Sequence, residues 1–201
     1  MEIILVRHGE SEFNIINNDP SLGRLYTGQY DTPLTEKGKM QAKLLKSKQL
    51  FENLDSVYSS DLTRAIETAY LVTETDKLIQ DSRLSERSLG IFEGKFKHEL
   101  VDHMKFISTT NFSHSFTEKA PNGENYADVL KRVANFFNEF DFKQNKSAIF
   151  SHYCCIRIII MLLTNLTQEE TLRLKIKNCQ PIVLKGMSVG NFKIIPWKDK
   201  P

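Results

Sequence analysis

Short apolar runs alternate along this chain with segments whose apolar residues recur every three or four positions. Each short run has the length and composition that predict a β-strand. The run at residues 3–6 is aliphatic throughout, which is typical of a strand buried on both faces of a sheet. The last two runs flank a turn that holds Gly186 and Gly190, so they predict a β-hairpin. The predicted strands are 3–6, 56–58, 148–150, 182–184 and 192–195.

The longer segments between these strands predict amphipathic helices. In residues 62–72 the apolar side chains fall at i, i+3, i+4, i+7 and i+10, and Ser60-Asp61 in front of them predicts an N-cap. Residues 129–140 repeat the pattern, with Asn125 available as the cap. Both helices should therefore turn one apolar face toward a sheet.

Two further segments predict helices of other kinds. Residues 35–50 are rich in lysine and predict a surface helix that rests on Met40, Leu44 and Leu45. Residues 155–163 are apolar nearly all round and predict a buried helix. Strands that alternate with helices indicate an α/β fold. We expect a three-layer α/β/α sandwich with a mostly parallel central sheet.

The composition is that of a globular domain. Of the 201 residues, 40% are hydrophobic and 26% are charged, which supplies a sizeable core and excludes a disordered chain. The length favours one domain over residues 1–201, with residues 95–121, the least regular part, as a variable lid or insertion. The net charge of +2 gives no reason to expect nucleic acid or a membrane as partner. No pattern in the sequence sets an oligomeric state.

Cysteine use and the first residues bear on location. The three cysteines are too few for a disulfide framework, and their spacing is wrong for a zinc site. The first two residues run straight into a predicted strand, without the basic and apolar stretch of a secretory signal. The longest apolar run, 158–163, is too short to span a bilayer. We expect a cytoplasmic protein that binds neither a metal nor a cofactor.

Polar residues with a shared chemistry follow three of the predicted strands. Arg7 and His8 come directly after the first strand, Arg64 follows the second, and His152 follows the third. Open α/β sheets bind ligands beyond the carboxyl ends of their strands, so these side chains should meet there. Two arginines suit a phosphoryl group, because the guanidinium fork matches its oxygens and keeps its charge. A neutral imidazole beside them can attack phosphorus.

Other routes of phosphoryl chemistry lack their residues here. The sequence has no G-x-x-x-x-G-K-[ST] loop and no H-E-x-x-H segment. None of the cysteines is followed, after five residues, by an arginine, which excludes a thiolate phosphatase. The residues therefore indicate phosphoryl transfer by histidine and arginine.

Five segments, in the same order along the chain, resemble blocks of the histidine phosphatase superfamily, which includes the cofactor-dependent phosphoglycerate mutases. The first reads Leu-Val-Arg-His-Gly-Glu-Ser-Glu-Phe-Asn at 5–14, and the third reads Tyr-Ser-Ser-Asp-Leu-Thr-Arg-Ala at 58–65. The resemblance extends from residue 3 to about residue 160. The five segments are 5–14, 26–38, 58–69, 84–94 and 151–157.

The resemblance implies a role for each matching residue. His8 would be the nucleophile that becomes phosphohistidine. Arg7, Arg64 and His152 would hold the phosphoryl oxygens and stabilise their charge during transfer. Glu86 would give a proton to the leaving oxygen and later help to activate water. The substrate contacts expected from the resemblance, and from its departures, are Asn14, Thr27, Gly28, Arg87, Lys97 and Tyr153.

Departures from the mutase pattern favour a phosphatase. Mutases usually carry Glu-Arg-His-Tyr-Gly in the acid block and an arginine pair downstream that grips a carboxylate. Here residues 86–90 read Glu-Arg-Ser-Leu-Gly, and residues 88–131 contain no arginine. Residues 92–94 and 121–124 look more like the phosphatase branch, and residues 15–25 form an apparent insertion beside the site.

We therefore expect a metal-independent phosphomonoester hydrolase of the histidine acid phosphatase type. It would act through a phosphohistidine on a small phosphorylated metabolite. The first alternative is a cofactor-dependent phosphoglycerate mutase. The second is a member that binds phosphorylated ligands or proteins and has weak catalysis. The sequence argues against this alternative, because every catalytic position is filled.

Overall fold

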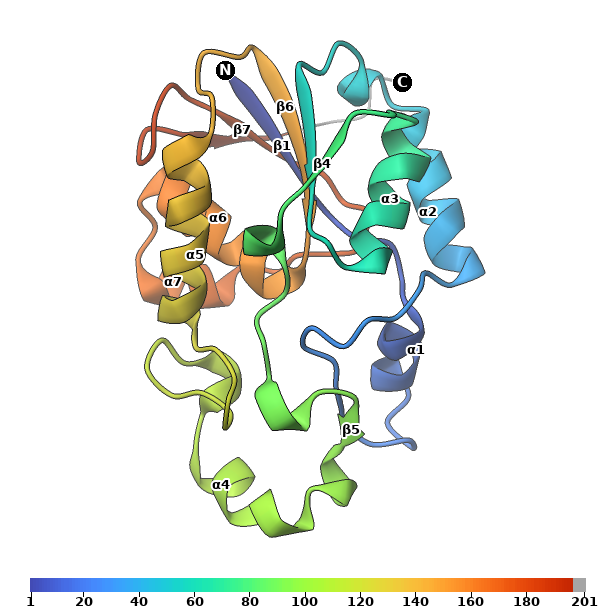
Figure 1. Cartoon of the computed structure of the whole chain (residues 1–201), viewed down its shortest axis with the longest axis vertical. Coiled ribbons are helices and arrows are strands. Elements are labelled where there is room, and N and C mark those ends of the chain that lie inside the picture. Colours follow the sequence, from blue (N-terminus) through green and yellow to red (C-terminus); the bar gives the residue numbers. More distant parts are fainter. Residues whose placement is uncertain (197–201) are drawn as a thin grey trace.

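The computed structural model describes residues 1–196 and is built around a six-stranded sheet (Figure 1). Its strands in spatial order are β4 (Leu78–Gln80), β3 (Ser56–Ser59), β6 (Lys146–Ser151), β1 (Glu2–Arg7), β7 (Ile182–Lys185) and β8 (Lys193–Ile195). The first four run parallel, and β7 and β8 are antiparallel additions. The mostly parallel sheet and the terminal hairpin are thus confirmed. Residues 197–201 of the expected domain 1–201 lie outside the described residues.

Helices cover both faces of this sheet (Figure 1). One face carries α2 (Glu36–Lys46) and α3 (Thr63–Thr73), and the other carries α5 (Tyr126–Glu139) and α6 (Tyr153–Thr164). Strand β1 feeds both cores, because successive side chains point to opposite faces. Ile3 and Leu5 belong to the core under α5 and α6, whereas Ile4 and Val6 belong to the core under α2 and α3. The three-layer sandwich is confirmed.

The remaining elements are short. They are α1 (Glu12–Asn18), α4 (Met104–Thr109), α7 (Gln168–Arg173), and 3-10 helices at Gln49–Phe51, Ser82–Leu84, Gly90–Phe92, Lys97–Glu99, Val101–His103 and Phe112–His114. Strand β4 has no counterpart among the predicted strands. It is an edge strand of three residues in which only Leu78 is partly buried, so its apolar run is too short to stand out.

The helix predictions hold for α5 and α6. The side chain of Asn125 caps α5 by accepting the N–H of Asp128 at 2.8 Å, and α6 is buried along most of its length. The cap predicted for α3 is wrong, because Leu62 is the N-cap and Asp61 accepts a hydrogen bond from the Ser85 hydroxyl instead.

Helix α2 packs differently from its prediction. It ends at Lys46, and its buried residues are Gly38, Ala42 and Leu45. Met40 and Leu44 are 63% and 65% exposed, so they do not carry the helix as predicted. Leu45 is buried as predicted, and at Gly38 the helix approaches the chain after β1 so closely that a side chain there would collide with the backbone of Glu10.

Residues 15–26 and 95–121 meet at one end of the molecule, and we call them the cap (Figure 1). They are joined by a separate two-stranded sheet, in which β2 (Leu25–Tyr26) pairs antiparallel with β5 (Lys95–Phe96). The expected insertion and the expected lid are therefore neighbours in space. A small apolar cluster holds the cap together and consists of Tyr26, Leu89, Phe92, Leu100, Phe112 and Ala120.

Within residues 1–196, none of the helices has the length and apolar character needed to cross a bilayer.

The contact between α2 and the chain after β1 generates a stability prediction. A Cβ built on Gly38 would lie 2.0 Å from the carbonyl oxygen of Glu10, and one on Gly9 would lie 2.5 Å from that of Gly38. We expect Gly38→Ala to reduce the free energy of unfolding by roughly 1–3 kcal/mol, the usual cost of overpacking. Urea unfolding would measure it. Lys43→Ala, an exposed position on the same helix, is the control, and equal midpoints for the two variants would contradict the prediction.

Candidate active site

The two histidines after β1 and β6 meet because these strands are parallel and in register. Arg7 pairs with Ser151 at the end of the ladder, so His8 and His152 are the next residues on adjacent strands. The N–H of His8 continues the ladder by donating to the carbonyl of Ser151 at 3.0 Å. The two imidazole rings lie 5.1 Å apart between centroids. The structure thus brings together what the sequence separates by more than a hundred residues.

The hydrogen bonds of His8 set which nitrogen can react. Its Nδ1 lies 2.7 Å from the carbonyl oxygen of Gly9. A carbonyl can only accept, so Nδ1 carries the proton and Nε2 keeps its lone pair. Burial, followed by the charges of Arg64 and Arg7, holds the pKa of His8 well below its usual value. The imidazole is therefore neutral at pH 7, with Nε2 available as a nucleophile.

The backbone at His8 and Gly9 is held by three hydrogen bonds to two side chains, those of Thr68 and Asn178. The N–H of Gly9 donates to the hydroxyl of Thr68 on α3 at 2.9 Å. The side-chain amide of Asn178 donates to the carbonyl of His8 at 2.7 Å and to that of Gly9 at 3.2 Å. Asn178 was not among the predicted site residues. It lies 170 positions away in a loop before β7, where no local pattern marks it.

Arg7 is anchored below the site and keeps one donor unpaired. Its Nη1 donates to the carbonyl of Ile176 at 2.9 Å, and its guanidinium lies 5.3 Å from the centre of the Tyr153 ring. The Nε of Arg7 is buried and has no hydrogen-bond partner. Burial lowers the pKa of Arg7, although the charge of Glu86 acts in the opposite direction.

Arg64 is held in the same manner from the start of α3. It is 1% exposed, and its terminal nitrogens donate to the carbonyls of Tyr30 at 2.9 Å and Gly28 at 3.0 Å. Gly28 has φ +51°, in the left-handed region, where a side chain would add strain. The Nε of Arg64 is likewise buried without a partner. Both arginines therefore present a fixed, unpaired N–H.

His152 contributes a third unpaired group. Its Nε2 lies 2.9 Å from the hydroxyl oxygen of Ser60, and its Nδ1 is buried without a partner. When Ser60 donates this bond, the proton of His152 resides on Nδ1, which then becomes a donor. Burial and then the charge of Arg64 hold the pKa of His152 well below its usual value. His152 is therefore a neutral hydrogen-bonding group beside His8.

Glu86 lies where the first turn of α6 can hold its carboxylate. Its Oε1 accepts the N–H of Cys154 at 3.0 Å and that of Arg87 at 2.8 Å. Arg132 on α5 fixes the backbone of this loop by donating to the carbonyl of Glu86 at 3.1 Å. Arg132 also forms an ion pair of 2.9 Å with Glu124. Helix α5 thus positions the expected acid, a function of Arg132 that the sequence did not indicate.

A cavity of about 420 Å³ opens between these residues and the cap. Arg7, His8, Arg64 and Glu86 line it, whereas His152, fully buried beside His8, is not among the lining residues. Five of the six expected substrate contacts also line it: Asn14, Thr27, Gly28, Arg87 and Tyr153.

Lys97 is the expected contact that the structure does not bring to this cavity. Its side chain is exposed, and its backbone N–H donates to the carbonyl of Arg24 at 2.7 Å. Arg24 lines the cavity instead, together with Ser113 and His114. The available signal was the insertion at 15–25, which holds Arg24.

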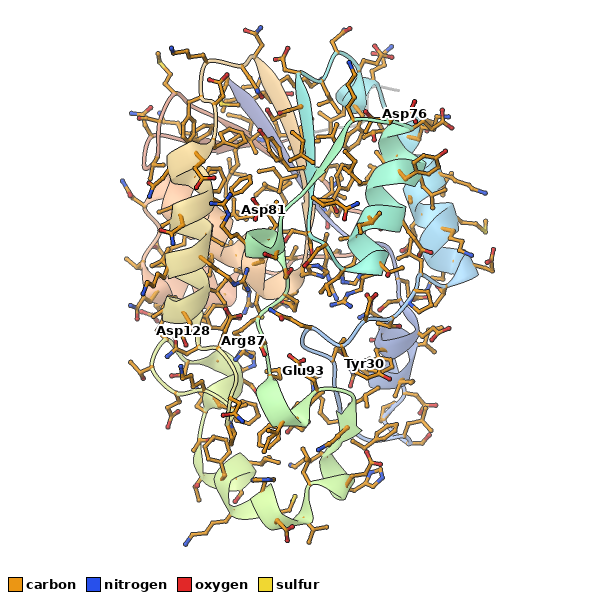
Figure 2. The ribbon with its side chains drawn as sticks, viewed as in Figure 1. Tyr30, Asp76, Asp81, Arg87, Glu93 and Asp128 are labelled. Atoms are coloured by element: carbon orange, nitrogen blue, oxygen red, sulfur yellow. The ribbon has the colours of Figure 1, made fainter. Side chains whose placement is uncertain are left out.

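Arg87 lines the cavity, but its charge is used within the protein. Its Nη1 donates to the carbonyls of Phe112 and Glu124, each at 3.0 Å, and its Nη2 donates to that of Ser113 at 3.2 Å. Figure 2 shows Arg87 in the band between the sheet and the cap, at the level of Glu93. Arg87 therefore ties the cap to the start of α5.

Among residues 1–196, no three His, Cys, Asp or Glu side chains are grouped so that they could hold a metal ion.

This arrangement agrees with the comparison with known families. The family model described as histidine phosphatase superfamily (branch 1) matches residues 3–199. The chain belongs to this superfamily. Its members include phosphatases and phosphoglycerate mutases, and both kinds occur among the proteins similar to this chain.

Two mutases are similar in sequence. A 2,3-bisphosphoglycerate-dependent phosphoglycerate mutase 2 of Gloeobacter violaceus is 29% identical, over 94% of this chain and 88% of its own length. The corresponding mutase of Bartonella bacilliformis is 32% identical, over 90% of each chain.

Two phosphatases are similar in structure, and at this identity the likeness shows the shared fold. The alpha-ribazole phosphatase of Shigella flexneri has a TM-score of 0.78 and 24% identity, over 97% of this chain and 96% of its own. A mycobacterial glucosyl-3-phosphoglycerate phosphatase, solved in complex with VO3, has a TM-score of 0.77 and 24% identity, over 99% of both chains.

The two buried histidines of this histidine phosphatase superfamily member generate a pH prediction. Their pKa values are lowered in the folded state, so below about pH 6.5 the unfolded chain binds protons that the folded chain does not. Stability should therefore be fully present above about pH 6.5 and fall as the pH decreases, by up to about 1.4 kcal/mol per pH unit for each histidine. Urea unfolding between about pH 5.5 and 7.5 would measure the slope. Because His8→Asn removes one titrating group, it should reduce that slope, and an unchanged slope would disprove the assignment.

Proposed function

We propose that this protein is a metal-independent phosphomonoester hydrolase that acts through a phosphohistidine on Nε2 of His8. The observation that carries the proposal is the fixed tautomer of His8, whose Nδ1 is bonded to Gly9. Beside it lie Nε of Arg7, Nε of Arg64 and Nδ1 of His152, which are buried polar atoms without partners among the described residues. Nε of Arg87 and Oγ of Ser11, from two further residues of the cavity lining, are in the same state. A phosphoryl group supplies the acceptor oxygens that such donors need.

The first step forms the phosphohistidine. Nε2 of His8 attacks phosphorus, and the P–N bond forms as the P–O bond to the leaving group breaks. Glu86, in its protonated form, gives its proton to the leaving oxygen, so an alcohol departs. Arg7, Arg64 and His152 hold the three remaining oxygens while their charge is redistributed.

The second step returns the enzyme to its starting state. Glu86, now a carboxylate, accepts a proton from water as the water oxygen attacks phosphorus. The P–N bond breaks, inorganic phosphate is released, and Nε2 of His8 regains its lone pair. A cavity of about 420 Å³ suits a small phosphorylated metabolite.

A phosphoglycerate mutase is the second candidate, and the mutases at 29% and 32% identity favour it. Against it, residues 88–131 contain no arginine that could grip a carboxylate there. Arg87, the nearest candidate, donates to three backbone carbonyls. A phosphatase therefore requires fewer of the observed contacts to change than a mutase does. A binding protein with weak catalysis is opposed by the complete set of catalytic side chains around His8.

A cytoplasmic location is part of the proposal. It is supported by Cys154, Cys155 and Cys179, all of which are free thiols.

The proposal predicts that His8 is phosphorylated during turnover. His8→Ala should reduce hydrolysis of p-nitrophenyl phosphate by several orders of magnitude, because it removes Nε2, the atom that attacks phosphorus in the proposed first step. Rapid quenching with a labelled substrate should trap acid-labile, base-stable phosphate on the wild-type protein only. Circular dichroism and urea unfolding would show that the variant is folded. Substantial activity in a folded His8→Ala variant would overturn the mechanism.

A second prediction separates the phosphatase from the mutase. With 3-phosphoglycerate and 2,3-bisphosphoglycerate as substrates, the protein should release inorganic phosphate faster than it converts one isomer to the other, because water reaches the phosphohistidine and no arginine pair retains the acid. Phosphate release and isomer ratio would be followed in the same reaction, with His8→Ala as the blank. Isomerisation well above phosphate release would assign the chain to the mutases instead.

A further inference from the structure

Arg24 occupies the cap side of the active-site cavity. It lines the same cavity as His8, and it precedes β2, the strand that joins the two parts of the cap. Its neighbour Leu25 is clamped by Asn17, whose side chain accepts the Leu25 N–H at 3.0 Å and donates to its carbonyl at 2.9 Å. The carbonyl of Arg24 itself accepts the N–H of Lys97 at 2.7 Å. The backbone of Arg24 is thus fixed on both sides.

The side chain of Arg24 differs from those of the other arginines in the cavity. Arg7, Arg64 and Arg87 each donate to backbone carbonyls. Within the described residues, the guanidinium of Arg24 makes no hydrogen bond and no ion pair, and its side chain is exposed to the cavity and to solvent. A fixed backbone therefore presents a guanidinium whose five N–H donors are all available.

The charge around the cavity is unbalanced. Among residues 1–196, its lining includes four arginines and a single carboxylate, that of Glu86. The reacting phosphoryl group accounts for Arg7 and Arg64, and Arg87 is neutralised in part by the carbonyls it binds. The charge of Arg24 is left without a partner from the protein or from a single phosphate ester.

Neutral polar groups line the cavity together with Arg24, among them Asn18, Ser113 and His114. Burial and then the charges of Arg157, Arg87 and Arg24 lower the pKa of His114, so its ring is neutral at pH 7. The cavity therefore combines the unpaired guanidinium of Arg24 with neutral hydrogen-bonding groups and with Arg87, as expected for a site that binds an oxyanion.

We propose that Arg24 binds a second anionic group of the substrate, so that the preferred substrates are phosphomonoesters that carry a carboxylate or a second phosphate. The guanidinium fork matches either group, because both present two oxygens in one plane. This inference rests on the proposed phosphatase function and goes beyond it by naming the class of substrate. It also assigns a role in specificity to the insertion at 15–25.

The experiment compares pairs of substrates that differ in the second anion. Glycerol 3-phosphate is paired with 3-phosphoglycerate for the carboxylate, and fructose 6-phosphate with fructose 1,6-bisphosphate for the phosphate. p-Nitrophenyl phosphate, which has no second anion, reports the chemistry alone. The variants are Arg24→Gln, which removes the charge at similar length, and Lys95→Gln. Lys95 is exposed, lies on β5, the strand paired with β2, and is not among the residues that line the cavity, so it is the control for charge.

We expect the wild-type protein to prefer the member with the second anion in at least one pair, by about 10- to 100-fold in kcat/KM, the range of one charge-assisted contact. Arg24→Gln should abolish this preference, chiefly through KM, and should lower kcat/KM for p-nitrophenyl phosphate far less, because that substrate has no second anion. Lys95→Gln should keep the preference. The pair that shows the effect distinguishes a carboxylate from a phosphate.

Two results would overturn the inference without touching the proposed function. One is a wild-type protein that hydrolyses p-nitrophenyl phosphate but in neither pair prefers the member with the second anion. The other is an Arg24→Gln variant that keeps the preference, which would make Arg24 a solvated surface residue. If none of the phosphomonoesters is hydrolysed by the wild-type protein, the proposed function itself fails.

Discussion

The proposed chemistry of this protein depends on the backbone of Gly9. Its carbonyl accepts Nδ1–H of His8, and its N–H is held by Thr68. Its Cα packs so closely on Gly38 that a Cβ would collide with backbone. Any shift of this peptide would rotate the imidazole or release its tautomer, and Nε2 would no longer be fixed toward the cavity. The sheet, α2 and α3 all contribute to holding one carbonyl oxygen in place.

The second constraint is the burial of positive charge. Arg64 and Arg87 are almost fully buried, which is costly unless each guanidinium is well hydrogen-bonded. Both obtain their bonds from backbone carbonyls of loops rather than from carboxylates. Among the described residues, Glu86 is the one carboxylate in the lining of the cavity, so little negative charge is placed there to repel a phosphorylated substrate. The same bonds order the loops at 28–30 and 112–113.

On the proposed function, the cap would select the substrate, whereas the sandwich would supply the reacting groups. The reacting groups come from the strand ends and from helices of the sandwich, whereas the far side of the cavity comes from the cap, which has its own small apolar cluster. Because the cap sheet β2–β5 links residues 25–26 to 95–96, a change in either segment moves the other. On the proposed function, substrate preference would vary through Arg24 and its neighbours while His8 and its donors stay unchanged.

The sequence by itself determined the sandwich, all five predicted strands to within two residues of their observed bounds, and the residues His8, Arg7, Arg64, Glu86 and His152 as a candidate group. The predicted elements are confirmed because apolar periodicity is a local signal. The structure also brings the five side chains together, because parallel strands align their carboxyl ends, whereas their catalytic roles rest on the family resemblance and stay a prediction. Only the tertiary structure shows where Asn178, Arg132 and Arg24 lie relative to the site. Each of these acts through a contact with residues distant along the chain, or by facing a cavity built from many segments. Lys97 was expected in the cavity and Arg24 is found there, because the pairing of β2 with β5 aligns residues that no local pattern connects.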